Sequence, residues 1–147
     1  MAIKGSCLCG NVAFEVKKFI GPFEICHCSR CRKVSGGQGV AGIGCHVADY
    51  LLIKGSEYIE SFEAPILHRP PVYEVHFCCQ CGSPVPPADP TGDFMEIAAG
   101  LLDDDPAIKP DKYIFIEYLP AWDSIADDLP QFTQIDLIKH RRANSSV

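Results

Sequence analysis

Eight of the nine cysteines in this 147-residue chain lie in three short groups, and this clustering constrains the fold more than any other feature. A C-x-C pair at a strand end places both sulfurs on one face, since side chains alternate with period two. A C-x-x-C pair turns the chain and brings both sulfurs towards one tetrahedral metal, with Zn–S distances of about 2.3 Å. Such close neighbours form disulfides poorly, so the grouping predicts metal sites. The groups are Cys7 and Cys9; Cys26, Cys28 and Cys31; and Cys78, Cys79 and Cys81.

The first and third groups together provide a complete set of four thiolates. A glycine follows each group, and glycine lets the backbone curl so that N–H groups point at the sulfurs. A zinc ion with four protein ligands is structural, and here it would tie the first strand to a distant segment of the chain. Two arrangements stay open from the residues alone: the first and middle groups could share one site, and Cys79 could replace Cys78. The predicted ligands are Cys7, Cys9, Cys78 and Cys81.

The middle group provides three thiolates within six residues: Cys26, Cys28 and Cys31. Three protein ligands with an open fourth position are typical of catalytic zinc, whose fourth ligand is water or substrate. His27 is one possible fourth ligand, although on a strand its ring would point away from its two cysteine neighbours. Cys45 is another, although a small buried apolar residue is the simpler interpretation. We therefore predict that these three cysteines hold a second, catalytic zinc.

Two neighbouring features have both a functional and a structural interpretation. The basic residues Arg30, Arg32 and Lys33 either offset the charge of the thiolates or hold the carboxylates of an anionic substrate. The glycine-rich residues 35–39 either let a ligand approach the backbone or form a plain loop. They are not a phosphate loop, because the Gly-Lys-Ser/Thr ending is absent. The single tryptophan, Trp122, is expected to pack rather than catalyse.

Short stretches rich in aromatic and β-branched residues recur through the chain, separated by twelve glycines and twelve prolines. They predict strands at residues 12–16, 41–45, 73–77, 94–99 and 113–119, with turns that include residues 69–71. We expect only short helices, after Cys28 and near residues 122–129. The pattern predicts a mainly β, single zinc-stabilised domain over residues 1–135, and a frayed polar tail over residues 136–147.

Composition excludes several classes of partner. The net charge of −6 disfavours binding to a phosphate backbone, so no nucleic-acid partner is expected. No run of about 18 apolar residues is present, so no membrane-spanning helix or membrane partner is expected. The N-terminus lacks an apolar signal region, and an odd number of cysteines argues against a disulfide framework. We therefore expect a cytoplasmic protein with metal-bound or free thiols.

Three ordered motifs, at residues 5–10, 26–33 and 77–84, contain the cysteine groups. With these motifs the chain resembles the glutathione-dependent formaldehyde-activating enzyme family. The segment around Trp122 and residues 129–132 is similar to the C-terminal part of that family, so the resemblance covers residues 3–132. The resemblance implies a mainly β zinc fold similar to that of B-type methionine sulfoxide reductases. It also implies two zinc ions per chain, one structural at Cys7, Cys9, Cys78 and Cys81, and one at Cys26, Cys28 and Cys31.

The family reaction joins formaldehyde to glutathione, giving S-hydroxymethylglutathione, and is classed as carbon–sulfur lyase chemistry. The resemblance thus implies a zinc-dependent carbon–sulfur lyase acting on glutathione or a related thiol adduct, with Cys26, Cys28 and Cys31 as catalytic residues. The alternative is a non-enzymatic, zinc-stabilised binding module in which both metal sites are structural. A third hypothesis is a thiol-redox protein using Cys81 with Cys78 or Cys79; metal ligation of these thiols would exclude it.

Overall fold

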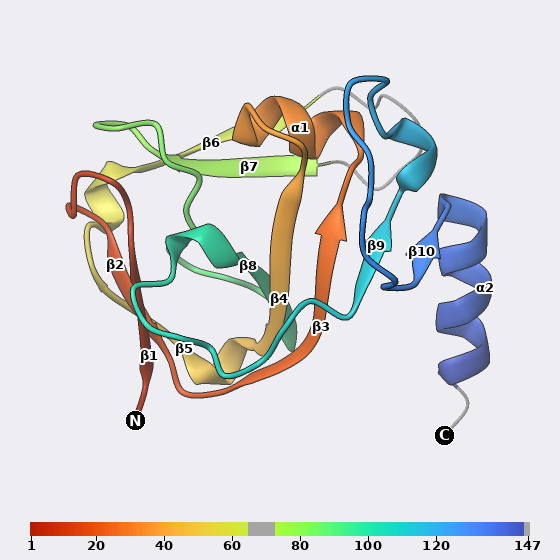
Figure 1. The fold of residues 1–147 in the computed structure, drawn as a ribbon. Coiled ribbons are helices and arrows are strands. Elements are labelled where there is room, and N and C mark those ends of the chain that lie inside the picture. Colours follow the sequence, from red (N-terminus) through yellow and green to blue (C-terminus); the bar gives the residue numbers. More distant parts are fainter. Residues whose placement is uncertain (65–72, 146–147) are drawn as a thin grey trace. The chain divides into compact units, whose positions relative to one another are not determined.

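The computed structural model describes residues 1–64 and 73–145 (Figure 1). Within these residues strands predominate and the two α-helices are short, which confirms the predicted mainly β class with short helices. The predicted turn at residues 69–71 lies outside the described residues. No helix in the described ranges is long and apolar enough to cross a membrane.

The chain divides into two compact units: the first contains the first and third cysteine groups, and the second contains the middle group. The first unit comprises Met1–Pro22 and Gly42–Ile108, and the second comprises Phe23–Ala41 and Lys109–Val147. The strands β3 (Phe19–Cys26) and β4 (Val40–His46) each begin in one unit and end in the other. The domain boundary predicted at residue 135 remains a prediction.

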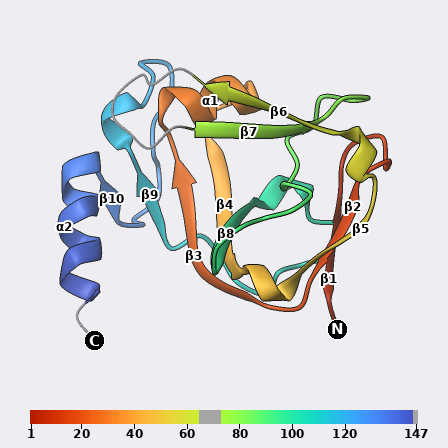
Figure 2. The ribbon, with the colours of Figure 1, turned by 180° about the vertical axis from the view of Figure 1, so that it is seen from behind.

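The first unit is built from antiparallel strand pairs, which Figure 2 shows from behind. Strands β1, β2 and β5 form one sheet, β6 pairs with β7, and β4 pairs with β8. Their core contains the fully buried side chains Val12, Phe14, Val16, Ile43 and Ile97. The bounds are β1 (Ile3–Ser6), β2 (Ala13–Val16), β5 (Tyr50–Lys54), β6 (Ile59–Ala64), β7 (Tyr73–Cys78) and β8 (Phe94–Ala98), with 3₁₀ turns η1 (Val47–Asp49), η2 (Ser56–Tyr58) and η3 (Ala99–Leu101).

The packing of this unit explains the alternating sequence pattern. Phe14 and Val16 are buried in β2 while their neighbours are less so, and Met95 and Ile97 alternate in the same way in β8. Gly5 lies opposite Phe14 in the register of β1 and β2. A Cβ at Gly5 would lie 2.3 Å from the Phe14 ring, so the absence of a side chain there allows the ring to enter the core.

The second unit is built on parallel pairs: β9 (Lys112–Ile114) pairs with residues 24–26 of β3 on one side and with β10 (Gln131–Phe132) on the other. It also contains α1 (Ser29–Ser35), η4 (Ile116–Tyr118) and α2 (Gln134–Asn144). The helix predicted after Cys28 is thus confirmed. The strand predicted over residues 113–119 ends early, because Phe115 adopts a left-handed conformation with φ of 57°.

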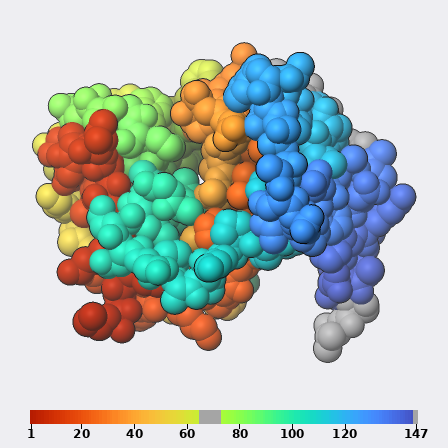
Figure 3. Space-filling view, in the orientation of Figure 1, coloured from red at the N-terminus to blue at the C-terminus, as the bar shows by residue number. Residues whose placement is uncertain are grey.

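Two other expectations for the second unit are wrong. Residues 122–129 form a turn, bends and irregular backbone instead of a helix, with Asp127 accepting a hydrogen bond from the backbone N–H of Leu129. The predicted frayed tail is instead helical through Asn144. Thr133 caps α2 by accepting from the N–H of Asp136, and Leu137 is 2 % exposed. Most of the remaining surface of α2, dark blue in Figure 3, is exposed.

Candidate metal and active site

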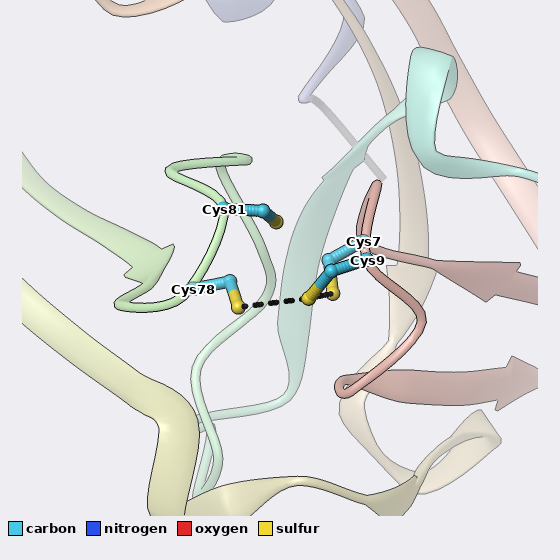
Figure 4. Close-up of side chains that lie close together, drawn as sticks. All are labelled: Cys7, Cys9, Cys78 and Cys81. Atoms are coloured by element: carbon cyan, nitrogen blue, oxygen red, sulfur yellow. Dashed lines mark hydrogen bonds between the residues drawn. The ribbon is translucent and has the colours of Figure 1, made fainter.

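The structure of the first unit brings four cysteines together from two distant segments. The Sγ atoms of Cys7 and Cys9 are 3.5 Å apart, and those of Cys9 and Cys78 are 3.8 Å apart (Figure 4). All four sulfurs, including that of Cys81, lie within 4.8 Å of one another. A tetrahedron with Zn–S bonds of about 2.3 Å has sulfurs about 3.8 Å apart. The cluster therefore fits a four-coordinate zinc. The sulfur–sulfur distances are much longer than the S–S bond of a disulfide, which is about 2.05 Å.

The same backbone turn positions each half of this four-cysteine cluster. The N–H of Gly10 donates to the carbonyl of Cys7 at 2.9 Å, and the N–H of Gly82 donates to the carbonyl of Cys78 at 2.7 Å. Both glycines have positive φ, 74° and 76°, which residues with a Cβ rarely adopt. The glycines thus produce the curled backbone that the sequence predicts at each cysteine pair.

Polar hydrogens approach the sulfurs of the four-cysteine cluster. The N–H of Val12 donates to Cys7 Sγ at 3.2 Å. The hydroxyl of Ser83 lies 3.3 Å from Cys81 Sγ, and hydrogen bonding with this hydroxyl lowers the pKa of Cys81 to about 5. The same Ser83 oxygen accepts from the N–H of Leu8 at 3.0 Å and so joins the two halves. Ser83 was missed by sequence reasoning, because a lone serine after a cysteine motif gives no pattern of its own.

The structure of the second unit brings together the three middle cysteines, whose sulfurs also lie within 4.8 Å of one another. Cys26 ends β3, Cys28 is the N-cap of α1, and Cys31 lies in the first turn of that helix. The Cys28 sulfur accepts a hydrogen bond from the N–H of Cys31 at 3.4 Å, which is the capping contact. The Cys28 sulfur thus takes the place of the usual capping oxygen at the start of this helix.

The electrostatics of this three-cysteine cluster favour a bound cation. Hydrogen bonding to Cys26 and then to Cys31 lowers the pKa of Cys28 to about 2. Hydrogen bonding to Cys28 and then to Cys31, followed by burial, raises the pKa of Cys26 far above that of an ordinary thiol. One thiolate therefore forms readily while the next is opposed by its neighbours. A divalent cation would reduce this opposition, because its two positive charges offset two of the three thiolate charges. The donor set fits zinc.

The alternative ligands lie outside these two clusters in the described part of the chain. His27 is 3 % exposed, and its Nδ1 lies 2.9 Å from the carbonyl oxygen of Gln38. Cys45 belongs to the first unit and is fully buried, and burial raises the pKa of its thiol to about 11. Cys79 is exposed, and Cys78 occupies the position in the four-cysteine cluster.

The basic and glycine-rich residues that follow the three-cysteine cluster lie in the same unit. Gly36 ends α1 in a left-handed conformation, and its N–H donates to the carbonyl of Arg32 at 2.9 Å. The Nε atom of Arg32 is buried without a hydrogen-bond partner. A Cβ at Gly39 would lie 2.3 Å from the carbonyl oxygen of Cys26, so the glycine-rich loop presses directly on the backbone of the cluster. Close packing against Cys26 therefore explains why residue 39 of the glycine-rich loop is a glycine.

The fold and the two clusters define a mainly β protein with one four-cysteine and one three-cysteine site, both suited to zinc. A family model described as glutathione-dependent formaldehyde-activating enzyme matches residues 2–118. A protein of Halomonas elongata, provisionally named a glutathione-dependent formaldehyde-activating enzyme, is 34% identical over 125 residues, which cover 83% of this chain and 80% of the relative. The chain belongs to the glutathione-dependent formaldehyde-activating enzyme family.

A solved structure supports the fold independently of the family match. The crystal structure of a Rhodobacter sphaeroides protein superposes with a TM-score of 0.50 and 20% sequence identity. The similarity covers 73% of this chain and 91% of the other. At this level of identity the similarity concerns the fold alone.

Proposed function

We propose that this protein is a zinc-dependent carbon–sulfur lyase acting on glutathione or a related thiol adduct, in the manner of an S-hydroxymethylglutathione synthase. The observation that supports this best is the cluster of three sulfurs within 4.8 Å, contributed by Cys26, Cys28 and Cys31. Three protein donors leave one position for a substrate on a four-coordinate metal. Membership of the family supports the choice of a thiol and formaldehyde as substrates.

The proposed reaction joins the thiol sulfur to the carbon of formaldehyde. A zinc ion held by the three cysteines would bind the substrate thiol and lower its pKa, supplying a thiolate near neutral pH. The carbonyl oxygen takes up a proton to become the hydroxyl of the adduct, so the thiol proton is balanced and no electrons are exchanged. The chain's own part is to hold the sulfurs: the β3 end fixes Cys26, while the capped first turn of α1 fixes Cys28 and Cys31.

The four-cysteine cluster has a different role in this proposal. Its four thiolates would complete the coordination of a second zinc, so that no position remains for substrate. Cys7 and Cys78, which are 3 % and 0 % exposed, belong to a core cluster with Val12 and Val85. We therefore assign this zinc a structural role, giving two zinc ions per chain. A reducing cytoplasm suits both sets of thiols.

A non-enzymatic binding module is the second candidate, in which the three-cysteine cluster is also closed by a fourth protein ligand. His27 is the residue to consider, because it lies between two of the cysteines in the chain and its Nε2 is buried without a partner; its ring nitrogens lie outside the group of sulfurs within 4.8 Å, which counts against this candidate. A metal-loaded crystal structure distinguishes the two proposals. Four protein ligands at both metals favour the binding module, whereas a solvent or thiol ligand at the second metal favours the lyase.

The proposed function is tested by Cys28→Ala, with Cys45→Ala as the matched control because Cys45 is buried outside both clusters. We expect Cys28→Ala to lose one of two metal equivalents and to abolish acceleration of S-hydroxymethylglutathione formation. Cys45→Ala should keep both. Metal analysis, glutathione titration and the rate of formaldehyde consumption measure these outcomes. Unchanged activity in a metal-deficient Cys28→Ala protein would exclude the proposed mechanism.

A further inference from the structure

Glu24 is a carboxylate buried in β3, two residues before the first cysteine of the three-cysteine cluster. The residue is 3 % exposed, and its strand ends at Cys26. Burying a charged group costs free energy unless partners of opposite charge surround it. A buried carboxylate so close to a proposed metal ligand therefore requires an explanation, and its partners show what it does.

Two cations from distant segments pair with this carboxylate. The Nζ of Lys112 lies 3.6 Å from its Oε1, and the guanidinium of Arg141 donates to its Oε2 at 2.8 Å. Lys112 lies opposite Glu24 in the register of β3 and β9, whereas Arg141 belongs to α2 and is 117 residues away in the chain. Each carboxylate oxygen thus has its own cation, one from the sheet and one from the C-terminal helix.

The paired strands connect this ion pair with Cys26. The register of β3 and β9 continues without a break from Glu24 to Cys26, which lies opposite Ile114. Just beyond it, the N–H of His27 donates to the carbonyl of Ile114 at 3.1 Å. Because side chains alternate along a strand, Glu24 and Cys26 project from the same face of β3. A shift of the strand at Glu24 would therefore also move the Cys26 sulfur.

The helix that supplies Arg141 is otherwise held by few contacts. Leu137 is buried, but most of the other side chains of α2 are exposed. The helix follows β10, which pairs with the side of β9 opposite to β3, so the contact of Arg141 with Glu24 links this segment back across β9 to β3. The family model ends at residue 118, so β10 and α2 lie beyond the matched part, whereas Glu24 lies within it.

We propose that Glu24 and Arg141 are positioning residues for the three-cysteine cluster, because their ion pair fixes the end of β3 and with it the Cys26 sulfur. This inference rests on the proposed function and adds to it a role for the C-terminal helix. Residues that orient metal ligands from behind typically contribute about 10–100-fold to metal affinity. The burial of Glu24 makes the pair stronger than an exposed one. The helix thus sets how tightly the cluster holds its metal.

Arg141→Met tests the inference, because methionine keeps an apolar stem and removes the charge. Lys112 still pairs with Glu24 in this variant. A chelator titration of the zinc-loaded protein measures both sites, and the zinc equivalent that is missing from Cys28→Ala identifies the three-cysteine cluster. We expect the zinc affinity of this cluster to fall about tenfold, and that of the four-cysteine cluster to stay unchanged. Arg141→Lys should restore most of the affinity. The control is Arg142→Met, at the exposed neighbouring arginine.

Each other outcome overturns the inference. A native zinc affinity in Arg141→Met would show that the ion pair does not position the cluster. Equal weakening of both clusters would show a general loss of stability, and no recovery in Arg141→Lys would show that the charge does not act. If Arg141→Met does not fold, Arg141→Gln takes its place, and a native affinity there would also refute the inference. Failure of the proposed function is distinguishable, because the zinc affinity would then still depend on Arg141 although the native protein does not accelerate the reaction of glutathione with formaldehyde.

Discussion

Replacing Cys78 by Ser tests the structural role of the four-cysteine cluster. Cys78 is fully buried, and its sulfur lies 3.8 Å from that of Cys9, which is 69 residues away in the chain. A metal that bridges these segments removes loop-closure entropy from the unfolded chain, as a disulfide does. For a loop of this length the chain-entropy relation gives about 4 kcal/mol at 25 °C. We expect Cys78→Ser to lower the free energy of unfolding by at least this amount.

The loss would be a large part of the 5–15 kcal/mol typical of a natural domain. For a chain of this size, about 4 kcal/mol corresponds to a fall in the midpoint of thermal unfolding of about 12 °C. Circular dichroism during heating, urea denaturation and metal analysis of the same samples provide the measurements. A chelator should lower the unfolding midpoint of the native protein towards that of the variant, and it should lower the midpoint of the variant less.

The matched control is Cys79→Ser, because Cys79 is the exposed neighbour outside both clusters. Its stability should stay within about 0.5 kcal/mol of the native value, as is usual for surface substitutions. The reasoning is refuted if Cys78→Ser retains two metal equivalents and native stability. It is also refuted if both substitutions destabilise equally, since the effect would then not depend on the cluster.

Two further substitutions test the packing of the second unit. Gly39→Ala would place a Cβ 2.3 Å from the backbone carbonyl oxygen of Cys26. We expect the metal affinity of the three-cysteine cluster to fall at least tenfold, measured by competition with a chelator. The control is Gly37→Ala, whose Cβ would lie 3.6 Å from its nearest neighbouring atom and which should keep the native metal affinity. Arg141→Ala removes a 2.8 Å ion pair with the buried Glu24 and should cost about 1–3 kcal/mol in urea denaturation. The exposed neighbour Arg142 is the control, and equal effects at both arginines would exclude the pairing as the cause.

The sequence alone predicts the mainly β class, the alternating strands and the division of the cysteines. These features depend on local rules. Alternating apolar and polar side chains indicate a strand with one buried face, and cysteines two or three residues apart indicate a metal-binding turn. The contact between Cys9 and Cys78 is long-range, and the residues alone left it open, because the first and middle groups could have shared one site and Cys79 could have replaced Cys78. Sequence patterns predict the structure correctly where the spacing of ligands or the periodicity of apolar residues lies within a short stretch of the chain.

The helix at the C-terminus was missed for the opposite reason. Residues 134–144 have a polar sequence without a clear apolar stripe, so periodicity gives no helix signal there. The structure shows a capped helix with Leu137 buried and Arg141 paired with the buried carboxylate of Glu24. That pairing depends on a residue 117 positions away, which no local window contains. Tertiary contacts therefore overrode a weak local preference.

The same distinction between local and long-range information applies to the proposed active site. The spacing of Cys26, Cys28 and Cys31 identifies the sulfurs, but their neighbour His27 reads from sequence only as a doubtful fourth ligand. Its orientation depends on Gln38 and Tyr113, which lie on separate segments and hold the ring through a carbonyl contact and a stacked ring. Local spacing therefore identifies the sulfurs, whereas the orientation of the neighbouring ring depends on contacts that no short window of sequence contains.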